Sequence, residues 1–164
     1  MYRMWLSVFG AGYSPLVPGT CGSAVVSALF LAAAWWGLTG WGLILFLAVV
    51  SLHGAFVTVL YGDKFIAELG PDPGVIVSDE QCGQAITYMG LWSFAGEPKE
   101  ILVIAATGFV LFRLFDIIKP PPVRQLEKVK GAWGVLLDDI MAGIYAAAVL
   151  QVIYHSHFLD GLWS

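Results

Sequence analysis

The sequence predicts an all-α membrane protein, a polytopic helical bundle of about five membrane-inserted helices, one of which is short or re-entrant. Of its 164 residues, 59% are hydrophobic and only 12% are charged, whereas soluble domains carry about 25% charged residues. No Asp, Glu, Lys or Arg lies between Arg3 and Asp63. Apolar stretches of about 18 residues or more indicate membrane spans. The length suits a single membrane-embedded domain over residues 1–164.

The first two spans are expected at Ser23–Trp36 and Trp41–Tyr61, joined by the short turn GLTG as a helical hairpin. The residues before them are expected to be retained, because glycines and prolines interrupt their apolar stretch and no small-residue cleavage site follows it. Lys64–Leu69 is expected to prolong the second helix beyond the membrane. The turn-rich loop GPDPG follows at Gly70–Gly74.

A fifth segment, Gln81–Gly96, is uncharged but short. As a helix it would reach about 24 Å, less than the ~30 Å hydrocarbon core of a bilayer. We therefore expect a short span or a re-entrant helix there. The remaining spans are expected at Ile101–Ile118 and Ile140–Tyr154, with Asp138 and Asp139 just before the last one.

The distribution of positive charge decides between four and five crossings. With five crossings, one side of the membrane holds seven of the eight Lys and Arg residues, whereas four crossings split them three against five. Positive residues concentrate on the cytoplasmic side, which favours five crossings with the N-terminus inside and the C-terminus outside. The seven residues are Arg3, Lys64, Arg113, Lys119, Arg124, Lys128 and Lys130.

Four polar motifs meet at this predicted cytoplasmic face, and the first two mark helix starts. PGTCGS (Pro18–Ser23) is expected to begin a helix with Thr20 or Ser23 as its cap, and such a helix end favours an anion. In SDEQCGQ, Asp79 and Glu80 open an apolar helix. These acids either offset the helix dipole or bind a hard cation.

The other two motifs place charge inside or beside membrane helices. FRLFDIIKP puts Arg113 and Asp116 on one helix face, with Lys119 a turn later, where prolines end the helix. That pair is either a structural salt bridge or part of a site, since ionisable residues in membrane helices are commonly functional. KGAWGVLLDD brings Asp138 and Asp139 to the start of the last helix.

Together the motifs favour metal-assisted attack of water on a phosphomonoester. Carboxylates without clustered Cys or His favour Mg²⁺, and Arg and Lys beside the metal favour phosphate recognition. The candidate catalytic carboxylates are Asp79, Glu80, Asp116, Asp138 and Asp139. The candidate phosphate-binding residues are Arg113, Lys119, Lys130, Thr20 and Ser23.

In order and spacing, these motifs resemble those of the phosphatidylglycerophosphatase A family, over almost the whole chain. The last two, FRLFDIIKPPPVRQLE and KGAWGVLLDDIMAGIYA, are the specific ones. The resemblance implies a multi-pass phosphatase of the bacterial inner membrane whose active site faces the cytoplasm. Its implied reaction is the Mg²⁺-dependent hydrolysis of phosphatidylglycerophosphate to phosphatidylglycerol and phosphate.

On this basis Glu80, Asp116 and Asp139 are expected to lie innermost and to hold the metal. The expected partner is a phospholipid substrate rather than a nucleic acid. The sequence leaves open the oligomeric state and whether water or a carboxylate is the nucleophile. The alternative function is a small transporter or channel with an interfacial acid–base network. A transporter would be expected to carry polar residues across the whole bilayer, whereas here they stop at one face.

Overall fold

The computed structural model describes residues 2–15, 17–70, 74–91 and 96–156, which form helices and turns without any strand. The helices are α1 (Tyr2–Leu6), the 3₁₀ helix η1 (Ala11–Tyr13), α2 (Pro18–Trp35), α3 (Gly40–Leu69), α4 (Ser78–Tyr88), α5 (Pro98–Ile118), α6 (Val123–Leu126) and α7 (Ala132–His155).

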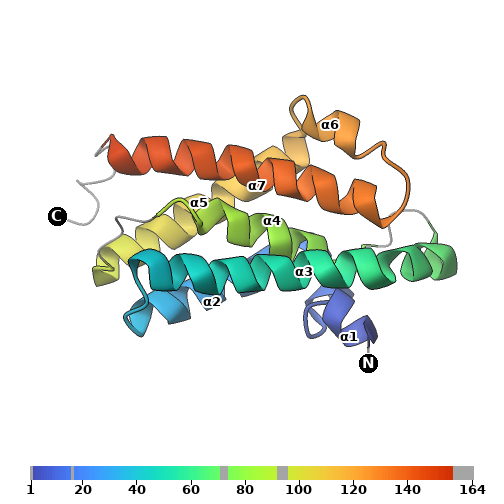
Figure 1. Ribbon diagram of the computed structural model, residues 1–164, viewed down its shortest axis with the longest axis horizontal. Helices are drawn as coiled ribbons and strands as arrows, with labels where there is room; N and C mark the ends of the chain where they lie inside the picture. The colour runs from blue at the N-terminus through green and yellow to red at the C-terminus, as the bar shows by residue number, and fades with distance from the viewer. Residues whose placement is uncertain (1, 16, 71–73, 92–95, 157–164) are drawn as a thin grey trace.

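Four of these helices, α2, α3, α5 and α7, are long and apolar enough to cross a membrane, which confirms the predicted all-α membrane bundle. They lie roughly along one long axis (Figure 1). The predicted hairpin is formed by α2 and α3, and α3 continues to Leu69, as its sequence indicates. Trp35, Trp36 and Trp41 are exposed at the hairpin turn, where an aromatic belt is expected.

The short fifth segment is α4, which begins three residues before its predicted start and ends at Tyr88. Eleven helical residues span about 16 Å, too little to cross a bilayer. Residues 92–95 of the predicted segment lie outside the described residues. Because α3 ends and α5 begins at opposite ends of the bundle (Figure 1), the chain passes from one end to the other by way of α4.

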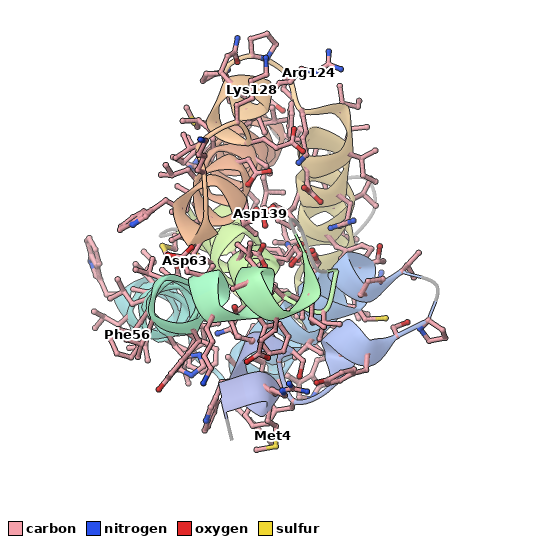
Figure 2. All side chains as sticks on the ribbon, turned by 90° about the vertical axis from the view of Figure 1, so that its right-hand side faces the viewer. Met4, Phe56, Asp63, Arg124, Lys128 and Asp139 are labelled. Carbon is pink, nitrogen blue, oxygen red and sulfur yellow. The ribbon has the colours of Figure 1, made fainter. Side chains whose placement is uncertain are left out.

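Helix α4 lies at the centre of the bundle, where it contacts α2, α3, α5 and α7 (Figure 2). Glycines allow this close packing. A Cβ atom on Gly54 of α3 would overlap the carbonyl oxygen of Ser78, and one on Gly143 of α7 would overlap that of Gly83. At its other end, Tyr88 stacks on Phe30 with ring centroids 4.3 Å apart. The first turn of α4 is therefore held at a fixed depth inside the bundle.

Helix α7 begins at Ala132, eight residues before the predicted start at Ile140. Asp138 and Asp139 are therefore not before the helix but in its second turn, where both side chains are buried. The prediction was wrong because it treated two adjacent acids as a helix start. The real start is held by Asp63 of α3, whose carboxylate accepts a hydrogen bond of 2.7 Å from the backbone N–H of Ala132.

Candidate active site

A cavity of about 390 Å³ opens where α3 and α5 end and α4 and α7 begin. Seen from this end of the bundle, Asp139 lies near the centre of the bundle (Figure 2). The cavity is unusually rich in charge for a bundle whose helices are otherwise apolar. Its charged lining residues are Asp79, Glu80, Asp116, Lys119, Glu127, Lys130, Asp138 and Asp139. All five predicted carboxylates and two of the three predicted cations therefore line one cavity.

Three of the carboxylates lie close enough to share one cation. Oxygens of Asp79, Glu80 and Asp139 all lie within 4.8 Å of one another. Both Asp79 and Asp139 are only 4% exposed. One oxygen of each of the three is buried without a hydrogen-bond partner among the described residues: Asp79 Oδ1, Glu80 Oε2 and Asp139 Oδ1. Uncompensated buried carboxylates are costly, so this set fits a hard divalent cation with oxygen ligands. We call it the acidic triad.

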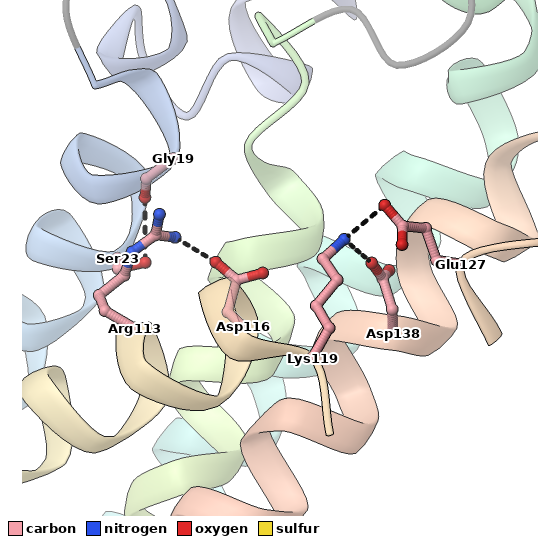
Figure 3. Close-up of polar contacts among 7 residues, drawn as sticks. All are labelled: Gly19, Ser23, Arg113, Asp116, Lys119, Glu127 and Asp138. Carbon is pink, nitrogen blue, oxygen red and sulfur yellow. Dashed lines mark hydrogen bonds and ion pairs between the residues drawn. The ribbon is translucent and has the colours of Figure 1, made fainter. Parts of the chain in front are cut away.

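The predicted metal set differs from the triad in one member. Asp116 lines the same cavity, but its Oδ2 lies 2.6 Å from Nη1 of Arg113 in an ion pair. The two side chains therefore share one face of α5, as their spacing predicted (Figure 3). A metal-binding role for Asp116 stays a prediction. Nε of Arg113 is buried and has no hydrogen-bond partner in the part of the chain that the structure describes, so the guanidinium retains a donor.

Lys119 contacts two carboxylates outside α5, those of Asp138 and Glu127. It ends α5 in the left-handed region, with φ of 49°, and this turn directs its side chain towards α7 rather than towards Asp116. Nζ donates to Asp138 Oδ2 at 2.7 Å and to Glu127 Oε1 at 2.9 Å (Figure 3). Partial burial acts to lower the pKa of Lys119. Its hydrogen bonds and attraction to the two carboxylates outweigh this effect, so its pKa is raised and it stays charged.

Only one of the three remaining predicted phosphate ligands lines the cavity. Lys130 is exposed and lines the cavity, whereas Thr20 and Ser23 are not among its lining residues. The capping prediction was wrong, because α2 begins at Pro18 and has no side-chain cap. The hydroxyl of buried Ser23 instead donates to the carbonyl oxygen of Gly19 at 3.0 Å (Figure 3).

Sequence reasoning missed three residues that shape the site. Glu127, which follows the proline turn and α6, accepts a hydrogen bond from Lys119. Asp63 accepts one from the backbone N–H of Ala132 and so fixes the start of α7. Gly19 packs directly on Glu80, since a Cβ atom there would overlap Glu80 Oε1 and lie 3.2 Å from Nη1 of Arg113. The available signal for Gly19 was its place in the PGT turn, but nothing in the sequence pairs it with Glu80.

Comparison with known proteins adds an independent observation. The family model described as Phosphatidylglycerophosphatase A matches residues 4–154. Phosphatidylglycerophosphatase A of Escherichia coli strain K12 is 38% identical over 163 residues, covering 95% of this chain and 84% of that protein. The protein of the same name from Haemophilus influenzae is 35% identical, covering 90% of this chain and 85% of its own length.

A third relative carries a different description. A putative phosphatidylinositol-3-phosphatase of Bacteroides thetaiotaomicron is 35% identical over 144 residues, covering 88% of this chain and 87% of that protein. No solved structure matches the chain. The three relatives share names that describe phosphatases acting on phospholipids.

Proposed function

Because the chain belongs to the phosphatidylglycerophosphatase A family, we propose that it removes the terminal phosphate of phosphatidylglycerophosphate, giving phosphatidylglycerol and inorganic phosphate. The observation that carries this proposal is the acidic triad, which lies with cationic side chains in one cavity of an apolar bundle. A lipid in the surrounding bilayer can present its headgroup to such a cavity without leaving the membrane.

We propose Mg²⁺ as the cofactor, held by the acidic triad of Asp79, Glu80 and Asp139. The donor set is made entirely of carboxylate oxygens, which Mg²⁺ prefers, and it has unpartnered oxygens available. When bound, the ion would neutralise charge on the phosphoryl oxygens and acidify a coordinated water. Asp116, oriented by Arg113, is proposed as a further ligand or as a base at the edge of the triad.

The chain's own cations would then hold the phosphate. Lys119 is anchored by Asp138 and Glu127, which fixes its ammonium at the cavity wall. Lys130 reaches the same cavity from the loop before α7. A carboxylate of the cavity would accept the proton of the attacking water. As the bond between phosphorus and the glycerol oxygen breaks, that oxygen would take up a proton from the protonated carboxyl group or from solvent and leave as the alcohol. Mutual positioning of these groups, rather than a covalent step, is expected to supply most of the rate.

We place the cavity at the cytoplasmic face of the bacterial inner membrane. The cavity lies at the end of the bundle that carries α6 and the start of α7 (Figure 1), and Arg124 and Lys128 lie at that end (Figure 2). Such an accumulation of positive charge is typical of a cytoplasmic surface. Cysteine labelling of intact cells tests this: Lys64→Cys should be protected and Ser164→Cys accessible, and the reverse pattern would overturn the assignment.

Phosphate release by the purified protein in detergent tests the proposed function. Phosphatidylglycerophosphate should be hydrolysed in preference to phosphatidylinositol 3-phosphate, the substrate suggested by the name of one relative. A chelator should abolish the activity, and added Mg²⁺ should restore it. Absence of phosphate release from either lipid would favour the alternative of a transporter, and full activity in excess chelator would exclude metal assistance.

Arg113→Lys is expected to insert normally but to lose at least ~10-fold in kcat/KM. An ammonium keeps the charge and can still pair with Asp116, but it cannot reproduce the planar fork that binds a carboxylate and a phosphate together. Steady-state kinetics with the lipid substrate measure the loss, which corresponds to about 1.4 kcal/mol of transition-state binding. Arg124→Lys, an exposed position on α6, is the matched control. Equal kinetics for the two variants would assign Arg113 a purely structural role.

A further inference from the structure

A second hollow lies outside the active-site cavity, in the groove between α2 and α5. It has a volume of about 340 Å³ and is open along its length. Its lining includes Ala24, Ala28 and Leu31 of α2 and Leu102, Ala106 and Phe109 of α5. Among the described residues, none of those that line it is charged. Both helices belong to the membrane-spanning set, so the groove faces the hydrocarbon part of a bilayer.

The groove shares no lining residue with the active-site cavity, but one of its ends lies close to the site along these two helices. Phe109 precedes Arg113 by one helical turn, and Ala24 follows Gly19 by little more than one turn. Gly19 and Arg113 are themselves adjacent across the two helices. One end of the groove therefore lies about 6–8 Å from the edge of the site, and the interval from Ala24 to Leu31 extends about 10 Å further from it.

The groove exists because small side chains face each other across the helix pair. Ala24, Ala28 and Ala106 are exposed alanines, whereas Leu31 and Leu102 stand at the end away from the site. The opposite end approaches Arg113, whose buried Nε has no hydrogen-bond partner. Apart from Ser27, the described residues that line the groove are apolar. A cation with an unused donor at one end of such a groove matches a molecule with an anionic head and a hydrocarbon tail.

We propose that this groove holds one acyl chain of the lipid substrate while the headgroup occupies the active-site cavity. The inference rests on the proposed function and deepens it. Bilayer lipid is as apolar as the groove, so the chain gains little hydrophobic free energy by entering it. The groove instead fixes the position of the lipid relative to the site. An acyl chain lying between α2 and α5 sets the depth in the membrane at which the lipid's phosphate meets the acidic triad.

Filling the groove tests the proposal. Ala28→Trp and Ala106→Trp each place a large side chain in it. Ala148→Trp is the matched control, because Ala148 is an exposed alanine on a different membrane helix, α7. Each variant is assayed with a long-chain substrate in mixed micelles and with a short-chain, water-soluble analogue whose chains end before Ala28 and Ala106. Thermal unfolding in detergent checks that each variant is folded.

We expect both groove variants to lose at least ~10-fold in kcat/KM on the long-chain substrate, since small misplacement of a reacting group is that costly. Their activity on the short-chain analogue should match that of Ala148→Trp. Equal losses on both substrates would overturn the proposal and assign the groove to helix packing or to contact with a second copy. Wild-type rates on the long-chain substrate would also overturn it. Inactivity of the wild-type protein on any lipid phosphate would instead refute the proposed function.

Discussion

Asp139→Asn is expected to lower kcat/KM by at least ~10²-fold, because Asp139 is the member of the acidic triad contributed by α7, facing two neighbours from α4. Asn keeps the shape of the side chain but removes its charge. A neutral amide oxygen is a weaker ligand for a divalent cation, and the loss of metal-centred charge stabilisation costs several kcal/mol in the transition state.

Thermal unfolding with and without Mg²⁺ separates this effect from loss of structure. In metal-free protein, Asp139→Asn removes one of three close buried charges, so its Tm should equal or exceed that of the wild type. Added Mg²⁺ should raise the Tm of the wild type, by preferential binding to the folded state, and raise that of the variant much less. Glu68→Gln is the control, because Glu68 lies outside the cavity and pairs with Arg3 at 3.0 Å. If Mg²⁺ raised the Tm of the wild type and of Asp139→Asn equally, Asp139 would not be a ligand of the metal.

Most of the fold could be predicted from hydropathy, because a bilayer forces long apolar stretches into helices. The boundaries that could not be predicted are those where charge enters the bundle. Asp138 and Asp139 look like a helix start in the sequence, yet they are buried in the second turn of α7 and face the cavity. Their placement depends on Asp63, which lies 69 residues before Ala132 and fixes the first turn of that helix.

The candidate site could be predicted as a set of residues but not as a set of contacts. Composition and motif spacing predicted that all five carboxylates lie at one face of the membrane, and in the structure all five line one cavity. Which of them share a cation depends on how α4 packs on α7. Close contact of Gly83 with Gly143 sets that packing, and it brings Asp79 rather than Asp116 into the triad. The partners of Lys119 depend likewise on a left-handed helix end that only the structure reveals.

Gly19→Ala is expected to lower kcat/KM by up to ~10²-fold although the residue has no chemistry of its own. Its added Cβ would overlap Glu80 Oε1. The atom that must yield is the end of a flexible side chain, so Glu80 should move and the helices stay in place. Ala is also the better helix former, so unfolding should not explain a loss of activity. A shift of about 1 Å in a reacting or metal-binding group can cost ~10²-fold.

Two further variants make the Gly19 prediction specific. Gly42 lies near the start of α3, where a Cβ atom would meet nothing within 4 Å, so Gly42→Ala should keep full activity and gain up to about 1 kcal/mol of helix stability. In the Gly19→Ala background, Glu80→Asp shortens the displaced side chain by one methylene and should recover part of the lost rate and of the Mg²⁺-dependent rise in Tm. Wild-type kinetics for Gly19→Ala, or no recovery in the double variant, would mean that contact with Gly19 does not position Glu80.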